Sequence, residues 1–536
     1  MQAPGAHRIR QWRQVASAAR RCYSVRVPGS PSGSITTIAD LKSWKPGGEA
    51  QDVQVSGWVR SVRKTAAARF VDITDGSSMR PVQAVLDKAM PAADIRPGAA
   101  VRLTGTWRNE AISPQSFNES SPSEDIQMER QQKHTQGVAE LRVKAMEILG
   151  ASDPQTYPIQ NKYQSPESLR NIPHLRPRTP VNSTLLRLRS DALAILTQFF
   201  FKEKFQQTHP PIITSSDCEG AGEAFNVKAG GKHEFFKTPK YLTVSSQLHL
   251  EALAQALGNV WTLSPTFRAE KSDTSRHLSE FYMLEAEMSF VQDMDEVMDL
   301  AQRMLAALAE GLKQLPAAQE LEANRLDSKE PEERLAFQDL VDREELQRRW
   351  RGLTSPAKWP RLTYTEAIEK LQPVAEQFEH KPVWGAGLQS EHEKFLAREV
   401  GYDKASDALL PIFITHYPRE IKAFYMLQSS SSPPQGITVD CFDLLVPDLG
   451  ELAGGSMREH RQTELEDNMR LHGLEVPKNR KATGNTMNWY LDLRRWGCPP
   501  HGGFGVGFDR LLSYLTGVPN VREVVPFPRY HERCDC

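Results

Sequence analysis

A run of alternating glycines near the C-terminal end places the strongest constraint on this chain. The run from His501 to Arg510 has glycine at positions 503, 505 and 507. In a β-strand, residues two apart share a face, so these glycines leave one face bare enough for a planar base or a nucleotide backbone to approach. Arg510 follows at the start of a predicted helix. Taken alone, the pattern is more typical of a bulge or a close-packing site, so it needs a second segment beside it.

Residues 267–287 supply that second segment and predict a β-hairpin with one polar face and one core face. The polar face carries Arg268 and Glu270 on the first strand and, on the second, Phe281, Met283, Glu285 and Glu287. An Arg-x-Glu pair by itself is usually a solvated ion pair. A purine between the Phe281 ring and the Arg510 guanidinium, however, gains stacking and cation–π energy, and the fork-shaped Arg268 suits an α-phosphate. Together the two segments predict an ATP site that works by stabilising phosphate charge.

Length and composition indicate a multidomain globular protein. A chain of 536 residues is too long for one ordinary core, and 39% hydrophobic with 25% charged residues is typical of a soluble protein. The sequence contains no apolar span of about 18 residues, so no membrane-spanning segment is predicted. The six cysteines form no Cys-x-x-Cys pair, which favours a reducing compartment and argues against structural zinc.

The N-terminal end is basic and contains no acid. Its first 39 residues lack Asp and Glu but hold six arginines, a pattern that predicts a mitochondrial targeting segment over residues 1–34 and a protein of the mitochondrial matrix. The alternative is a basic arm that grips nucleic acid. Residues 21–24, Arg-Cys-Tyr-Ser, are a candidate processing region. Removing the six arginines from a chain of formal charge −1 leaves −7, so an RNA partner would be held by local contacts.

The rest of the chain divides into three parts. Short alternating runs at 53–60, 70–73, 81–86, 101–107 and 139–143, bounded by Gly, Asp and Pro, predict a small β-barrel domain over residues 35–152, with a polar insert at 111–136. Six prolines between 153 and 180 predict a hinge that cannot be one helix. Residues 181–536, opening with a predicted helix at 185–207, would form one large domain.

The glycine strand and the hairpin resemble motifs 3 and 2 of class II aminoacyl-tRNA synthetases. Pro211, after the helix at 185–207, resembles motif 1, the dimer-interface segment of that class. The resemblance implies an α+β fold: an N-terminal OB-fold barrel plus a catalytic domain built on an antiparallel β-sheet flanked by helices, in a homodimer. It implies catalytic roles for Arg268, Glu270, His277 and Arg510, and ATP contacts from Arg268, Glu270, His277, Phe281, Gly505, Gly507 and Arg510.

The barrel resembles the anticodon-binding domain of the aspartate, asparagine and lysine group, on its strand order and its Gly-Trp-Val-Arg phrase at 57–60. By that resemblance Phe70 would stack on an anticodon base while Arg63 and Gln83 bond base edges. Each of the three is as compatible with ordinary barrel surface. The implied partner is a tRNA.

The phrase from Cys441 to Leu452 resembles the family's metal-binding segment. Asp443 and Glu451 match its magnesium-binding Asp and Glu, and hard oxygen ligands suit Mg²⁺ that bridges phosphates. Asp440 and Asp448 compete, although a single acid in a polar turn is usually only a turn former. Activating a carboxylate with ATP needs charge neutralisation and in-line geometry, so no protein nucleophile is required.

The amino-acid substrate is also implied by resemblance. Gln247, in Val-Ser-Ser-Gln-Leu, matches the residue that contacts the substrate amino group, and Glu219 would take the ammonium. Aspartate enzymes have Lys three positions after that Gln, whereas this chain has Leu250, which disfavours aspartate. Arg495 matches the side-chain-reading Arg and Glu223 would accept from the amide NH₂ of asparagine.

Residues 218–225, 417–426 and 521–528 resemble phrases of asparaginyl-tRNA synthetases, and the likeness runs from about residue 50 to 530. It implies ATP-dependent ligation of asparagine to tRNA(Asn) through an asparaginyl-adenylate, in mitochondrial translation. The nearest alternative is an aspartyl-tRNA synthetase, including one that loads tRNA for both amino acids. Two alternatives belong to other functional classes. One is a non-catalytic tRNA-binding paralogue, and the other is a synthetase-like core that makes free asparagine.

Overall fold

The computed structural model describes residues 24–28, 35–90, 95–110, 138–160, 162–215, 224–228, 235–236, 238–327, 340–474, 476 and 487–536. The chain divides into two compact units, one of residues 1–163 with 178–180 and one of residues 164–177 with 181–536. The expected insert at 111–136 lies outside the described residues, as does the expected targeting segment except for 24–28. None of the described helices is both long enough and apolar enough to span a bilayer.

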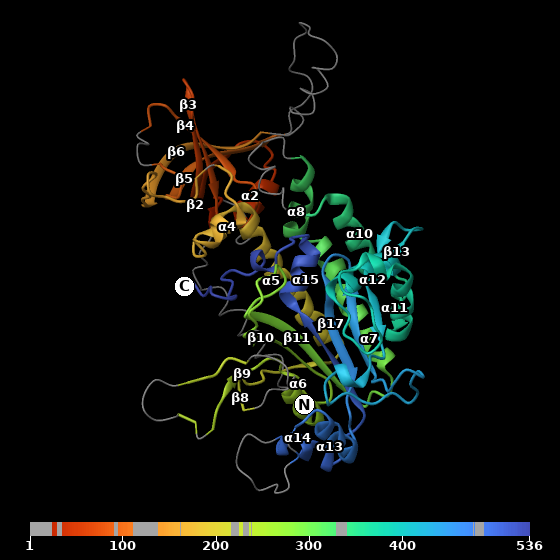
Figure 1. Ribbon diagram of the computed structural model, residues 1–536. Coiled ribbons are helices and arrows are strands. Elements are labelled where there is room, and N and C mark those ends of the chain that lie inside the picture. The colour runs from red at the N-terminus through yellow and green to blue at the C-terminus, as the bar shows by residue number, and fades with distance from the viewer. Residues whose placement is uncertain are drawn as a thin grey trace, which may run out of the picture. The chain divides into compact units, whose positions relative to one another are not determined.

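The first unit is a closed β-barrel. Its strands are β1 (Val25–Arg26), β2 (Ala50–Lys64), β3 (Ala68–Thr74), β4 (Val82–Asp87), β5 (Ala100–Glu110) and β6 (Val138–Gly150) (Figure 1). They pair in the order β1-β2-β3-β4-β6-β5, and β2 also pairs with β5, which closes a ring of five. Because β4 and β6 run parallel while the other neighbours are antiparallel, the ring has the Greek-key form of an OB-fold. The predicted barrel is confirmed.

The barrel interior follows from alternation along its strands. Val71 and Ile73 of β3 and Ala84 of β4 point inward and are fully buried, as the two-residue period of a strand requires. The short helix α2 (Ile38–Ser43) adds Ile38 and Leu41 to the same core. Val25, inside the expected targeting segment, also joins this core, because it is fully buried and pairs with Val55 of β2.

The second unit is built on an eight-stranded sheet. Its strands are β7 (Gln206–Gln207), β10 (Val260–Phe267), β11 (Glu280–Ser289), β12 (Arg361–Thr363), β15 (Ile412–Thr415), β16 (Cys441–Val446), β17 (Gly450–Met457) and β18 (His501–Gly507). The order is β12-β15-β16-β17-β18-β11-β10-β7, and only the two edge pairs are parallel. The predicted antiparallel sheet flanked by helices is confirmed. Two small ladders, β8 (Ile213–Thr214) with β9 (Tyr241–Leu242) and β13 (Tyr402–Asp403) with β14 (Ala408–Leu409), lie outside it.

The helices of this unit are α4 (Pro166–Arg170), α5 (Pro180–Lys202), α6 (Gln247–Leu257), α7 (Met294–Lys313), α8 (Pro316–Asp327), α10 (Arg343–Leu353), α11 (Tyr364–Leu371), α12 (Ser390–Gly401), α13 (Gln462–Leu471), α14 (Asn488–Arg495) and α15 (Phe508–Thr516). The helix expected at 185–207 is therefore shifted. Proline fits a first turn, whose amide groups need no partner, so α5 begins at Pro180. It stops before Lys204, which has a positive φ of 66°.

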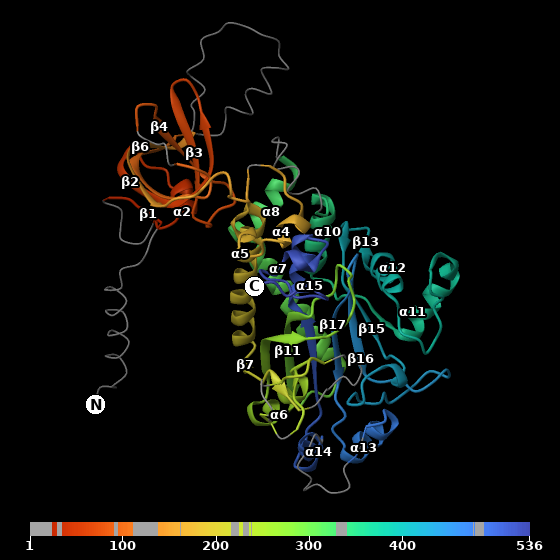
Figure 2. The ribbon, with the colours of Figure 1, turned by 60° about the vertical axis from the view of Figure 1, so that its left-hand side comes forward.

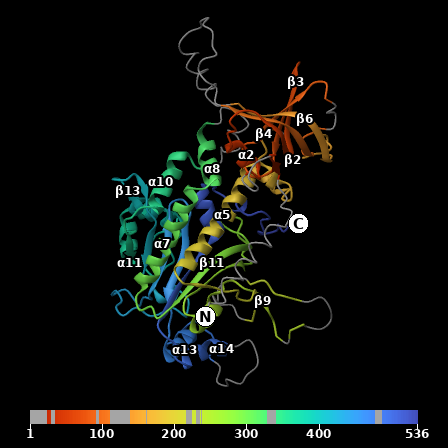
Figure 3. The same cartoon turned by 180° about the vertical axis from the view of Figure 1, so that it is seen from behind.

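The two faces of the sheet are covered differently. Helix α7 packs on β17 and β18 over one face (Figure 3), where Gly502 approaches Val297. On the opposite face α11 and α12 cover the end formed by β15 and β16, with Leu396 in their shared core (Figure 2). The glycines of β18 at 503, 505 and 507 belong to this second face by alternation, beside the part of the sheet that holds the main cavity.

Candidate active site

One cavity of about 560 Å³ lies over β11, β17 and β18. It brings together ten of the residues singled out from the sequence: Gln247, Arg268, Glu270, His277, Phe281, Asp443, Glu451, Gly505, Gly507 and Arg510. These residues come from segments up to 263 positions apart, Gln247 to Arg510. Phe281 and Arg510 line the same cavity, over an antiparallel part of the sheet that carries the β18 glycines.

The floor of the cavity is the surface of β18 at Gly505 and Gly507, and the strand register explains why it carries so few side-chain atoms. Met283, Glu285 and Glu287 of β11 stand directly opposite Gly507, Gly505 and Gly503 of β18. A Cβ added at Gly505 would meet only ordinary contacts, the nearest being the Met283 sulfur at 3.4 Å. A Cβ at Gly503 would lie 2.2 Å from both the Ala286 carbonyl oxygen and Glu287 Oε2. Gly505 thus leaves space on the cavity floor. The missing side chain at Gly503 instead makes room for the Glu287 side chain, which extends over β18.

Cations gather at the end of the cavity near the hairpin. The guanidinium carbon of Arg268 lies 5.7 Å from the centre of the Phe281 ring, and its Nη1 is 3.9 Å from Glu270. His277 Nε2 is 3.5 Å from the same carboxylate. Burial lowers the pKa of His277, and the charges of Arg510, Arg276 and Arg268 add to that effect against the opposing pull of Glu270. The arginines of this end suit a polyphosphate.

Three carboxylates line the neighbouring wall. Asp443 and Glu451 flank Gly454, whose added Cβ would lie 3.6 and 3.5 Å from their oxygens. Glu393 of α12 accepts a hydrogen bond from the Glu451 backbone N–H at 3.2 Å. It comes so close to Gly450, with φ of 80°, that a Cβ there would lie 2.4 Å from Glu393 Oε2. Burial, followed by the charges of Glu451 and Asp443, raises the pKa of Glu393 to about 7.

This wall fits a hard divalent cation. Lys422 donates to both oxygens of Asp443, at 2.8 and 2.7 Å, and Glu393 and Glu451 add two further carboxyl groups to the same wall. Carboxylate oxygens suit Mg²⁺ that also takes phosphate and water ligands. Of the competing acids, Asp448 pairs with Arg349 at 2.5 Å and with Arg398 at 2.6 Å, away from the cavity.

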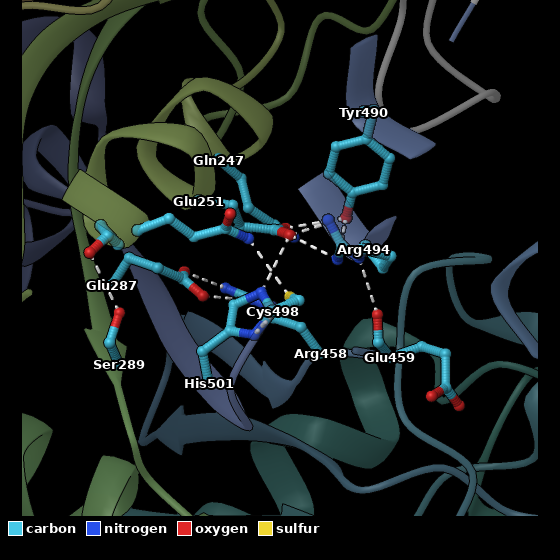
Figure 4. Close-up of polar contacts among 12 residues, drawn as sticks. Gln247, Glu251, Glu287, Ser289, Arg458, Glu459, Tyr490, Arg494, Cys498 and His501 are labelled. Atoms are coloured by element: carbon cyan, nitrogen blue, oxygen red, sulfur yellow. Dashed lines mark hydrogen bonds and ion pairs between the residues drawn. The ribbon is translucent and has the colours of Figure 1, made fainter. Parts of the chain in front are cut away.

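A buried ion pair forms the third part of the cavity. Arg458 donates to Glu287 through Nε at 3.2 Å and Nη2 at 3.0 Å, and both side chains are almost fully buried (Figure 4). Glu251, Glu287 and His501 have ligand atoms within 4.8 Å of one another. Arg458 and Arg494 already balance their charge, so we interpret the group as an ion-pair cluster.

The structure does not bring Arg495 into the cavity. Its side chain is exposed, lies 5.2 Å over the Trp496 ring and does not line the cavity. Successive residues of a helix point in different directions, and in α14 it is Arg494 that turns inward. Arg458, which was not singled out from the sequence, lines the cavity instead, beside Glu287. The two-residue period from Gly454 through Ser456 could have pointed to it. Glu219 and Glu223 lie outside the described residues.

The barrel residues share one outer face. Arg63 pairs with Phe70 across β2 and β3, with its guanidinium carbon 5.8 Å from the ring centre. Asp72, two residues after Phe70, pairs with Gln83 of β4. Residues two apart and residues directly opposite lie on the same side of a sheet, so Arg63, Phe70 and Gln83 form one patch.

Comparison with known proteins defines the class. The family model for class II tRNA synthetases (D, K and N) matches residues 165–531, and the chain belongs to that family. Asparaginyl-tRNA synthetase of Mus musculus is 37% identical over 538 residues, covering 97% of this chain and 99% of the relative. The mitochondrial asparagine–tRNA ligase of Saccharomyces cerevisiae is 40% identical over 486 residues, covering 89% and 92%. Within the class, the chain thus groups with the asparaginyl-tRNA synthetases, which are ligases.

Solved structures agree with this placement. Asparaginyl-tRNA synthetase from Pyrococcus horikoshii, complexed with asparaginyl-adenylate, superposes with a TM-score of 0.73 at 28% identity. The match covers 93% of this chain and 98% of that one, so it includes both compact units.

Proposed function

We propose that this chain ligates asparagine to tRNA(Asn) through an asparaginyl-adenylate. The observation that carries the proposal is the single cavity that joins a cationic end, an acidic wall and the Glu287–Arg458 pair. Relatives named asparagine–tRNA ligase support the substrate. The relative solved with asparaginyl-adenylate supports the intermediate.

In the first step a carboxylate oxygen of asparagine attacks the α-phosphorus of ATP. An oxygen–phosphorus bond forms, the bond between the α-phosphorus and the bridging oxygen breaks, and pyrophosphate leaves. Arg268 and Arg510 neutralise the phosphate charge that develops, while Phe281 stacks on the purine above Gly505 and Gly507. When bound, Mg²⁺ would be held by Asp443 and Glu451 and would neutralise further phosphate charge.

In the second step a ribose hydroxyl at the tRNA 3′ end attacks the carbonyl carbon of the adenylate. The new ester bond forms, the acyl–phosphate bond breaks, the hydroxyl proton is released and AMP leaves. Both steps need positioning and charge stabilisation but no covalent protein intermediate.

Selectivity for asparagine follows from the buried pair. An amide offers one acceptor and one donor group, so its oxygen would accept from Arg458 and its NH₂ would donate to Glu287. An aspartate carboxylate would instead lie beside the Glu287 carboxylate, and the buried Leu250 supplies no extra cation. Pyrophosphate exchange with asparagine and with aspartate tests this. Exchange that prefers aspartate overturns the substrate assignment in favour of the aspartyl alternative.

The barrel patch of Arg63, Phe70 and Gln83 would read the anticodon, since an aromatic ring beside a cation is a sequence-tolerant platform for unstacked bases. The half-buried Phe70 ring beside Arg63 supports this role.

A homodimer is also part of the proposal. Helix α5 exposes Leu193 and Phe201, and the segment after it exposes Ile212 and Ile213. Exposed apolar side chains gathered on one segment are characteristic of subunit interfaces. Sedimentation of the purified protein as a monomer at micromolar concentration would contradict it.

The acid-free, arginine-rich N-terminal segment supports a role in the mitochondrial matrix, as do the mitochondrial relatives from two yeasts. Because Val25 is part of the barrel core, cleavage would fall at or before residues 21–24. Fusing residues 1–34 to a fluorescent reporter tests whether this segment directs a protein to mitochondria. A reporter that stays in the cytosol would refute the targeting role.

A further inference from the structure

Glu251 lies directly behind the cavity and does not line it. It is fully buried on α6, one helical turn after Gln247. Its carboxylate accepts hydrogen bonds from Arg494 Nη2 at 2.6 Å, Tyr490 Oη at 2.8 Å, His501 Nε2 at 3.1 Å and Gln247 Nε2 at 3.1 Å. Figure 4 shows these side chains converging on it from α6, α14 and β18. Of the four donors, Gln247 alone also lines the cavity.

The charge of Glu251 decides how the Gln247 amide is oriented. Burial alone would raise the pKa of Glu251, but Arg494 and His501 hold it below its usual range. An ionised carboxylate has no hydrogen to donate and accepts only. Gln247 must therefore turn its NH₂ toward Glu251, because the flipped amide would set a carbonyl oxygen against a buried carboxylate. Its carbonyl oxygen is then left for other partners.

We propose that Glu251 is a positioning residue that fixes the Gln247 amide with its carbonyl oxygen toward the amino-acid substrate. An ammonium group brings only donors, so it binds a carbonyl oxygen and is repelled by an NH₂. The inference rests on the proposed function, in which Gln247 contacts the substrate amino group. It adds that a buried carboxylate without substrate contact sets the polarity of that contact.

Glu251→Gln is the variant that tests the idea, since it keeps the shape and can donate as well as accept. Both orientations of Gln247 then become possible. In asparagine-dependent pyrophosphate exchange we expect KM for asparagine to rise about 10- to 100-fold, the range for a hydrogen bond to a charged group. KM for ATP should stay within about twofold, because the ATP contacts are unchanged.

Glu345→Gln is the matched control. Glu345 is a largely buried glutamate that pairs with Arg349 at 3.4 Å and Arg398 at 3.2 Å, and it does not line the cavity. Its replacement should lower thermal stability without changing KM for asparagine. An equal rise of KM in both variants would show a general loss of stability and would overturn the inference.

The double variant Glu251→Gln with Gln247→Glu, in which the two residues are exchanged, tests the proposal even if Glu251→Gln alone does not fold. It keeps one carboxylate in the cluster, and that carboxylate presents oxygen to the substrate in either orientation. We expect it to recover most of the affinity for asparagine. A folded exchanged variant whose KM stays as high as that of Glu251→Gln would contradict the proposal.

Binding of two inhibitors isolates the contact. The probes are 5′-O-(asparaginyl)sulfamoyl adenosine and the same compound with hydrogen in place of its amino group. The wild type should prefer the first, and Glu251→Gln should lose about tenfold or more of that preference. An unchanged preference in a folded variant refutes the positioning role. No asparagine-dependent exchange in the wild type would instead remove the proposed function, and this inference with it.

Discussion

Replacing Glu393 by glutamine should stabilise the protein at about pH 8 in the absence of metal. The Glu393 carboxyl is 15% exposed and lies beside Glu451 and Asp443, so its charged form is penalised by burial and by two like charges. A pKa raised from 4.5 to about 7 corresponds to about 3 kcal/mol between the charged and neutral forms. Glutamine can accept the same bond from the Glu451 N–H without carrying the charge.

The sign of the pH dependence follows from the two pKa values. Below 4.5 the carboxyl is protonated in the folded and unfolded states, and its favourable contribution is fully present. Between 4.5 and about 7 the folded state holds a proton that the unfolded state has lost, so stability falls as pH rises. Above about 7 the whole penalty remains. The gain from Glu393→Gln should therefore be largest above neutral pH and small near pH 5.

Urea unfolding in EDTA at about pH 8 and about pH 5 measures the effect. Glu391→Gln is the control, because that glutamate lies two positions away on the same helix and its pKa is lowered, chiefly by the His380 backbone N–H. It should show no gain at high pH. The pyrophosphate-exchange activity of Glu393→Gln should be lower and should require a higher Mg²⁺ concentration, since one carboxylate is lost from the wall that also holds Asp443 and Glu451. A Glu393→Gln protein no more stable than the wild type at about pH 8 would refute this account.

Two further predictions concern the substrates. Arg268→Ala and Arg510→Ala should each reduce asparagine-dependent pyrophosphate exchange about 100-fold or more with little unfolding; normal exchange in both would overturn the assignment of the phosphate end. Phe70→Ala should raise KM for tRNA in aminoacylation about 10- to 100-fold, the value of one stacked base, and leave pyrophosphate exchange unchanged; an unaltered KM for tRNA would remove Phe70 from the anticodon patch.

The cationic end of the cavity could be predicted because its signals are local. The Arg268–Phe281 hairpin and the strand ending at Gly507 each carry their two-residue alternation within about ten residues. Their chemistry is visible before any tertiary contact is known. The barrel was predictable for the same reason, since inward and outward residues alternate along each strand.

Residues brought in by long-range pairing could not be predicted in the same way. Glu393 enters from α12, 50 positions before Asp443, and its helix gives no sign that it faces a strand turn. Arg495 lies outside the cavity, since two adjacent arginines leave the phase of a short helix undefined by the sequence. Arg458 follows the end of β17 on the face given by the two-residue period through Gly454 and Ser456, but its partner Glu287 lies 171 positions earlier, so the pair is visible only once the strands are assembled.

The glycines of β18 provide a matched pair that separates the two ends of the cavity. Gly503→Ala would place a Cβ 2.2 Å from the Ala286 carbonyl oxygen. Backbone cannot yield as a flexible side chain does, so we expect a loss of about 1–3 kcal/mol in stability. Glu287 Oε2, equally close, must also move away from Arg458, which should raise KM for asparagine.

Gly505→Ala differs from it by one strand repeat and should behave in the opposite way. Its Cβ would meet the Met283 sulfur at 3.4 Å and Glu285 Cγ at 3.6 Å, so folding should be unaffected. The methyl group would instead occupy the nucleotide floor and raise KM for ATP, with KM for asparagine little changed. If both variants altered the same substrate constant, the division of the strand into a nucleotide floor and a passage for Glu287 would be wrong. Stability and the two KM values, measured on both proteins, therefore decide between one shared role for the glycines and two separate ones.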